Sequence, residues 1–342
     1  MKTPHCPNTA CSKSASVIRY GFYRTKAGKR RRYRCSKCRK TFCSTVNTAY
    51  YRLQHRRSTF DEVAALSVEG VSKSAIARVK RLGWNTVDRW LERAAAFSRR
   101  FNDATVTGLD VPEIQADEIR TFAGSKDDVL WIFATLDVAS HLWPSTVVGR
   151  RSYRNTHALF KDTLRRMRDV CFPLIVTDGF DYYEKVVRQL FSVACVYGQV
   201  VKTRRNDRVI KVERRQIIGA KWRFEEALLE SEDSSTLNTS FIKRLNLTIR
   251  QATAYLTRRT TCHARRKKPL EDQLEIVRCY YNFLRPHRAL KFGSETRTPA
   301  MQAGLVRRRL TFRDVFTSAL SRVSSEIIIY KFSDVVRWAK VA

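Results

Sequence analysis

The stretch "FPLIVTDG", residues 172–179, decides the fold class of this chain. Its short apolar run predicts a buried strand that presents Asp178 where the strand ends. A second short strand pattern, "EIQADEI" at residues 113–119, places Asp117 and Glu118 at its centre or end. Two strands that carry acidic side chains at or near their ends suggest a functional site at one edge of a sheet.

The elements around these two strands alternate between strand and helix patterns. In chain order they are an apolar hairpin at 128–149, a helix at 155–170, a helix at 180–191 and a strand at 194–201. Asn155 or Thr156 is the expected cap of the first helix. Three strands in a meander, followed by helix–strand–helix–strand, match the ribonuclease-H-like fold, a mixed sheet with flanking helices. We therefore expect a multidomain α/β chain with this domain at residues 110–305.

Carboxylates in this position have a defined chemistry. Cleavage and transfer of phosphodiesters require stabilisation of the attacking and leaving oxygens, which two Mg²⁺ or Mn²⁺ ions provide through hard oxygen ligands. Asp117 and Asp178 lie where two such ligands belong. The stretch "NTSFIKRLNLTIRQ" (238–251) predicts an amphipathic helix packed beside them, with Lys243, Asn246 and Arg250 on its exposed face.

The charge balance points to a polyanionic partner. The chain has 342 residues, 66 Lys+Arg against 32 Asp+Glu, and a formal net charge of +34. A nucleic acid is the leading candidate and an anionic membrane surface the alternative. No secretory signal or membrane span is expected, because the longest mostly apolar run is about half the length that crosses a bilayer.

Two close cysteine pairs in the basic first 50 residues predict a structural zinc ribbon. The predicted ligands are Cys6, Cys11, Cys35 and Cys38. The segment between the pairs reads as a hairpin with Gly28 in its turn, while Arg39 follows Cys38 where a knuckle prefers glycine for its left-handed turn. Cys43 falls outside both pairs. The alternative is a disordered basic arm with unligated thiols.

Residues 58–98 carry three helix patterns. Gly70 is expected to stop the first helix and Ser72 to cap the second, which a glycine turn joins to the third. This arrangement reads as a helix-turn-helix DNA-binding unit, with an ordinary three-helix bundle as the alternative. The polar stretch at 98–113 is expected to be the linker to the next domain.

Several motifs together resemble the DDE transposases of bacterial insertion sequences, closest to the group named insertion sequence one. They are "CPNTAC", "YRCSKCRKTF", "QADEI", "VTDG", "NTSFIKRLNLTIRQ", "YYNFLRPHRAL" and "TPAMQAGL", together with the helix-turn-helix. The resemblance runs over most of residues 6–305. It implies binding to the terminal repeats of a mobile element, metal-dependent strand cleavage and strand transfer.

By this resemblance Asp117 and Asp178 are the first two catalytic acids, and the family has glutamate where this chain has Lys243. Three hypotheses follow for Lys243. The chain is a catalytically dead copy that still binds DNA, or serves as a repressor. Another acid from the stretch at 230–233 replaces the missing one, with Glu230, Glu232 or Asp233 as candidates. Otherwise the sequence or the alignment of this helix is in error.

The resemblance also implies double-stranded DNA as partner, assembly of a homo-oligomer on DNA, no membrane association and a location in the bacterial cytoplasm at the nucleoid. The predicted DNA contacts are Arg30, Arg31, Arg32, Arg34, Asn85, Thr86, Arg89, Asn246 and Arg250. Residues 306–342 form a tail of unknown role that contains a strand-like run, "EIIIYKF".

Overall fold

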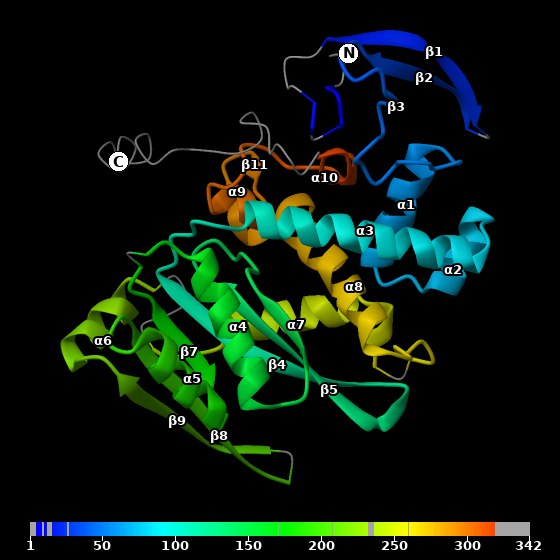
Figure 1. The fold of residues 1–342 in the computed structure, drawn as a ribbon. Helices are drawn as coiled ribbons and strands as arrows, with labels where there is room; N and C mark the ends of the chain where they lie inside the picture. Colours follow the sequence, from blue (N-terminus) through cyan, green and yellow to red (C-terminus); the bar gives the residue numbers. More distant parts are fainter. Residues whose placement is uncertain are drawn as a thin grey trace.

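A computed structural model describes residues 5–8, 10–11, 16–25, 27–169, 171–206, 208–231, 236–258 and 260–318. A small three-stranded sheet lies at one end, a layer of helices in the middle and a six-stranded sheet at the other end (Figure 1). One hydrophobic core connects the helical layer with the large sheet, running from Ala49 to Phe316. Within the described residues, no helix is both long and apolar enough to cross a membrane.

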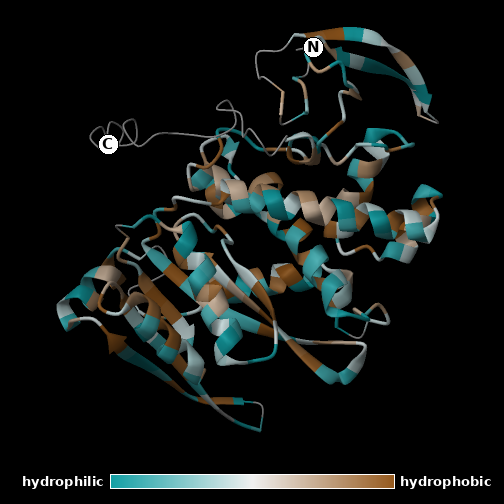
Figure 2. Cartoon of the chain, in the orientation of Figure 1, coloured by the Kyte–Doolittle hydropathy of each residue, from teal (hydrophilic) through white to brown (hydrophobic). Residues whose placement is uncertain are grey.

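The large sheet is mixed. Its strands are β4 (Glu113–Ala123), β5 (Ser125–Asp137), β6 (Thr146–Gly149), β7 (Leu174–Asp178), β8 (Val196–Arg205) and β9 (Arg208–Ile218). Their order is β6-β5-β4-β7-β8-β9, with β7 parallel to both β4 and β8 and all other pairs antiparallel. The central strands carry the apolar residues expected of strands buried on both faces, which Figure 2 shows in brown. All four predicted strand regions of this domain are therefore confirmed.

Helices cover both faces of this sheet. α4 (Tyr153–Arg166) and α5 (Asp181–Phe191) lie on one face, and α7 (Ser240–Gln251) lies on the other (Figure 1). α6 (Lys221–Leu229) packs beside β7 and β8. The predicted cap of α4 is wrong, because Ser152 occupies the cap position and its side chain accepts from the amide of Asn155.

The small sheet at the N-terminal end is a hairpin with one added strand. β1 (Val17–Thr25) pairs antiparallel with β2 (Gly28–Cys35), which pairs with β3 (Thr41–Cys43). Gly28 has a φ of 109°, a conformation that glycine adopts without steric cost, so the predicted turn is confirmed.

Three helices follow, α1 (Arg57–Val68), α2 (Lys73–Lys80) and α3 (Trp84–Thr105). Ser72 caps α2 through the amide of Ala75, as predicted. α2 ends differently from the expectation, because Arg81 takes the left-handed conformation and Gly83 becomes the N-cap of α3. The helices exist as predicted, and the assignment to a DNA-binding helix-turn-helix remains a prediction.

The expected polar linker at 98–113 is wrong in its first half, because α3 continues to Thr105. Ser98, Phe101 and Asn102 share one buried stripe of this helix. The Phe101 ring contacts Phe283 at 5.0 Å between centroids, and the Asn102 amide donates to Glu275 at 3.1 Å. These buried polar residues gave this part of the helix the composition of a linker, although it packs inside the core.

The remaining helices complete the core beside α3. They are η1 (Ala254–Leu256), α8 (Lys267–Cys279), η2 (Tyr280–Leu284), η3 (Arg288–Leu290), α9 (Pro299–Gln302) and α10 (Phe312–Thr317). β10 (Lys291–Phe292) and β11 (Glu295–Thr296) form a short hairpin. The strand-like run at 326–332 lies outside the described residues.

Asn282, on η2, fastens this region to the sheet domain. Its side chain is fully buried, accepts from the amide of Trp143 at 2.9 Å and donates to the carbonyl of the same residue at 2.9 Å. The segment between β5 and β6 is thereby held against the end of α8.

We expect Asn282→Ala to lower the free energy of unfolding by about 1–3 kcal/mol, because two buried backbone groups of Trp143 lose their partner. Urea denaturation followed by circular dichroism measures the change. Glu92→Ala on the exposed face of α3 is the control and should stay within about 0.5 kcal/mol of the native chain. Equal stability of the two variants would contradict this role for Asn282.

Candidate metal centres and nucleic-acid interface

The four predicted zinc ligands converge at one end of the small sheet. Cys6, Cys11, Cys35 and Cys38 place their sulfurs within 4.8 Å of one another. The sulfurs of Cys6 and Cys38 are 3.5 Å apart, and those of Cys11 and Cys35 are 3.6 Å apart. Four thiolates around a tetrahedral Zn²⁺ would be separated by about 3.8 Å, given zinc–sulfur bonds of about 2.3 Å. The cluster therefore fits a structural zinc ion.

The second knuckle has the geometry of a ligand turn. Arg39 adopts the left-handed conformation, with φ of 58°, that its position was expected to require. The backbone N–H of Lys40 lowers the pKa of the Cys38 thiol to about 6, and a lowered pKa favours the thiolate that binds metal. Cys43 is outside the cluster and contacts the hydroxyl of Thr45 at 3.1 Å.

Cys38→Ser should therefore release zinc from the purified protein, whereas Cys43→Ser should keep one zinc per chain. Native mass spectrometry measures the stoichiometry directly. The loss of a ligand should also lower the thermal stability of the small sheet, which has little apolar core of its own. Zinc loss in both variants, or in neither, would contradict this ligand set.

The second cluster is acidic and lies at an edge of the large sheet. The parallel register of β4 and β7 pairs Ala116 with Thr177, so that Asp117 and Asp178 follow one residue later on neighbouring strands. Asp117, Glu118 and Asp178 place one carboxylate oxygen each within 4.8 Å of the others. The structure thus brings the two predicted acids together and adds a third.

Each of the three carboxylates is held by specific donors. Asp117 accepts from the amide of Asn246 on α7 at 3.1 Å and from the backbone N–H of Glu118 at 2.9 Å. Glu118 pairs with Arg151 at 2.5 Å and accepts from the hydroxyl of Tyr183 at 2.6 Å. The Asp178 carboxylate accepts from the backbone N–H of Phe180 at 3.1 Å. These contacts fix the carboxylates in place from both faces of the sheet.

Burial disfavours the ionised forms of the three carboxylates, and the nearby cations do not fully offset this effect. Burial, and then the charge of Asp178, raises the pKa of Asp117 to about 6 and that of Glu118 to about 7. Burial also raises the pKa of Asp178 itself. Carboxylates that resist ionisation together are stabilised when a divalent cation binds among them, so the three side chains fit one Mg²⁺ or Mn²⁺ ion.

Lys243 lies on the same helix as Asn246, one turn earlier, at an exposed position. Its charge is attracted by Asp117 and Asp178, while partial burial and the neighbouring Lys202 lower its pKa to about 8. Within the described part of the chain, Lys243 forms no ion pair within 4.0 Å, so it makes no direct salt bridge to either aspartate. The ammonium is close enough to interact with both aspartates through charge, but it does not contact them.

Two further expectations about this region need correction. Asn246 was expected on the exposed face of its helix, but it is 9% exposed and holds Asp117. Among the described residues, Glu230 is not part of the acidic cluster and is exposed at the end of α6. Glu232 and Asp233, the other candidates for a replacement acid, lie outside the described residues.

Glu118 was not predicted as a site residue, although it stands beside Asp117 in the sequence. Neighbouring residues of a strand point to opposite faces of a sheet. Glu118 does project toward α5, opposite to Asp117, which contacts α7. Since β7 ends at Asp178, the longer glutamate side chain still reaches the other carboxylates beyond the strand end. The doublet of acids at 117–118 was the available signal in the sequence.

The predicted DNA contacts fall in three separate places. On β2, Arg31 lies over the ring of Phe22 at 4.0 Å and Arg34 lies over the ring of Tyr20 at 5.2 Å. Arg30 donates to the backbone carbonyl of His55 at 3.3 Å. The remaining contacts are Arg32 on β2, Asn85, Thr86 and Arg89 near the start of α3, and Asn246 and Arg250 on α7.

These groups differ in how available they are. Asn85 and Arg89 are exposed, and Thr86 and Arg250 are half-buried. Asn246 is committed to Asp117. β2 and the start of α3 therefore have side chains that can contact a partner, whereas α7 has mainly the half-buried Arg250.

Comparisons with known proteins give little further information. No family model matches the chain, and no curated protein matches it. One solved structure with a match is a piggyBac transposase synaptic complex with hairpin DNA, at 9% sequence identity and a TM-score of 0.34. The match covers 80% of this chain and 77% of the other, and a TM-score of this size assigns neither fold nor function.

The acidic cluster predicts pH-dependent binding of Mn²⁺. At pH 5.5 protons occupy carboxyl groups whose pKa values are raised to about 6 and about 7, and at pH 7.5 these groups are free to bind. Mn²⁺ should therefore raise the melting temperature of the zinc-loaded protein more at pH 7.5 than at pH 5.5, as measured by differential scanning fluorimetry. Asp178→Asn should abolish the shift, and a shift that is independent of pH would argue against binding at this cluster.

Proposed function

We propose that this chain is a DNA-binding protein of the DDE transposase type whose acidic site holds a single divalent ion. The observation that carries the proposal is the placement of Asp117 and Asp178 at neighbouring positions of the parallel strands β4 and β7, with Glu118 beside them. Carboxylates in this arrangement hold the metal ions that stabilise the charge developing on phosphodiester oxygens.

The topology of the large sheet supports this proposal. Three antiparallel strands, β4, β5 and β6, lie on one side, and the parallel strands β7 and β8 follow on the other side of β4. That order and the helices between the strands are those expected of a ribonuclease-H-like domain. The cysteine cluster and the basic hairpin between its two cysteine pairs support a zinc ribbon. The excess of positive charge supports double-stranded DNA as the partner. Assembly as a homo-oligomer on DNA at the bacterial nucleoid is part of the same proposal.

Each residue of the acidic site has a proposed task. A bound divalent ion would supply Lewis-acid stabilisation of a phosphate oxygen. Asp117, Glu118 and Asp178 would hold that ion, and Asn246 orients the Asp117 carboxylate toward it. Arg151 favours the ionised form of Glu118 against the effect of burial and holds its carboxylate in place through the guanidinium.

Lys243 limits what the site does. A cation stands where a second metal ion would need a carboxylate, so the second ion loses a ligand and meets a repelling charge. We therefore propose that the native chain binds DNA and is impaired in two-metal strand cleavage. A DNA-binding protein without catalysis, such as a repressor, is the second candidate function, and the position of Lys243 beside both aspartates favours it.

The test is a nicking assay on supercoiled plasmid with Mn²⁺. Lys243→Glu should nick the plasmid at least about tenfold faster than the native chain, because the substitution supplies a ligand and removes the repulsion. Arg244→Glu introduces the same change of charge at the next, exposed position of α7 and is the matched control. Gel electrophoresis resolves nicked from supercoiled DNA.

Three results are informative. Nicking by Lys243→Glu alone supports the metal role of this position. Equal rates for Lys243→Glu and Arg244→Glu would show that bulk charge, and not the site, controls the reaction. Plasmid binding without nicking by any variant favours the non-catalytic function, and absence of DNA binding contradicts both candidates.

A further inference from the structure

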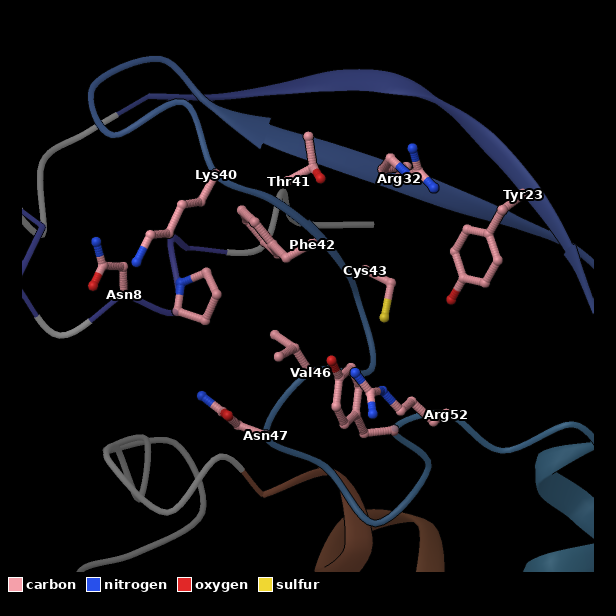
Figure 3. Close-up of a pocket in the computed structure, with 12 residues that line it drawn as sticks. Asn8, Tyr23, Arg32, Lys40, Thr41, Phe42, Cys43, Val46, Asn47 and Arg52 are labelled. Carbon is pink, nitrogen blue, oxygen red and sulfur yellow. The ribbon is translucent and has the colours of Figure 1, made fainter.

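A pocket between the zinc-ribbon sheet and the segment that leads into α1 has no role in the proposed chemistry. Its volume is about 580 Å³. The residues that line it include Tyr23, Arg32, Lys40, Asn47, Tyr51 and Arg52. Figure 3 shows side chains from the strands above and from residues 46–52 below extending toward one another across it.

The charge of this pocket is positive and uncompensated. Arg32, Lys40 and Arg52 line it, and no lining residue is acidic. The first carboxylate of the chain is Asp61, so none of the first 60 residues offers a counter-charge. Within the described part of the chain none of the three cations pairs with a carboxylate. Three cations without a counter-charge around one pocket favour an anionic ligand, and Arg and Lys are the usual partners of phosphate.

Aromatic rings accompany these cations. Arg32 lies over the ring of Tyr23 at 6.0 Å, and Arg52 lies over the ring of Tyr51 at 5.3 Å. Tyr51 is 40% exposed, which leaves part of its ring open to a ligand. Rings beside basic groups are the combination that binds unpaired nucleotides, since the base stacks and the phosphate pairs with the cations.

Size distinguishes a nucleotide from a lone phosphate. A cavity of 580 Å³ lies in the range of about 300–1,000 Å³ that holds small organic ligands. A single phosphate ion would leave most of this volume unfilled. The pocket therefore suits a group that carries both an anion and a flat ring.

The backbone on the lower side of the pocket is strained. Asn47 and Arg52 have φ values of 60° and 56°, in the left-handed region. Asparagine tolerates this region, whereas arginine rarely adopts it and does so at an energetic cost. Both residues line the pocket, so the surrounding structure holds Arg52 in a costly conformation at its wall.

We propose that this pocket binds one unpaired nucleotide of a DNA strand, with its phosphate held by basic side chains of the wall and its base against Tyr51. The proposal rests on the proposed DNA-binding function and adds a preference for DNA ends or distorted sites over intact duplex. Free inorganic phosphate shares the phosphate chemistry and lacks the base.

The test compares two fluorescent DNA ligands by anisotropy with the full-length, zinc-loaded protein. One is a blunt duplex, and the other is the same duplex with a three-nucleotide 3′ overhang. The overhang should bind about tenfold more tightly, as expected from stacking of one base. Lys40→Gln and Arg52→Gln should each remove most of that preference. Lys37→Gln is the matched control, because Lys37 is an exposed lysine of the same knuckle and does not line the pocket.

The outcomes separate this proposal from the function on which it rests. Binding of both ligands with equal affinity by the native chain overturns the pocket and leaves DNA binding intact. An overhang of three abasic nucleotides that binds as tightly as the normal overhang, together with competition by millimolar inorganic phosphate, shows a phosphate site only and also overturns it. Equal loss of the preference in Lys37→Gln shows bulk charge and overturns it as well. Failure to bind either DNA is a failure of the proposed function itself. Unchanged zinc content shows that each variant is folded at the ribbon.

Discussion

The parallel pairing of β4 with β7 is the constraint on which the acidic site depends. Its register aligns Ala116 with Thr177, and both aspartates follow directly. Since side chains alternate between the faces of a strand, a slip of one residue would send Asp117 toward α5 and away from α7. The register is fixed by apolar residues that fill both faces of the central strands and by the amide of Ile242, which donates to Gln115 at 3.1 Å.

Charge balance around that site decides how many divalent ions it can hold. Three carboxylates face Arg151, which pairs with Glu118, and the more distant Lys243. The raised pKa values of Asp117 and Glu118 show that these cations do not compensate the buried acids fully. One divalent ion would complete the compensation. Together with Arg151 and Lys243, one divalent ion already gives four positive charges against three carboxylates. A second ion would add to this excess, and Lys243 would repel it.

The sequence predicted the strands, the two aspartates and the cysteine ligands because each has a local signal. An apolar run that ends in an acid, or a close pair of cysteines, is visible within about ten residues. The length of α3, the buried position of Asn246 and the contribution of Glu118 could not be read in this way, because each depends on a partner far along the chain. Asn102 is an example, since it reads as a polar linker residue until Glu275 on α8 satisfies it.

Such long-range contacts also position the start of α3 relative to the large sheet. α3 begins at the exposed residues proposed to contact DNA and ends in the core that supports the large sheet. Because Phe101 and Asn102 fix this helix to η2 and α8, the start of α3 has a defined position relative to the acidic edge. Positive charge is concentrated before residue 61, whereas the buried acids lie on β4 and β7. Under the proposed function, this shared core would allow phosphate binding and metal binding, which need opposite charges, to act at separate points of one DNA strand.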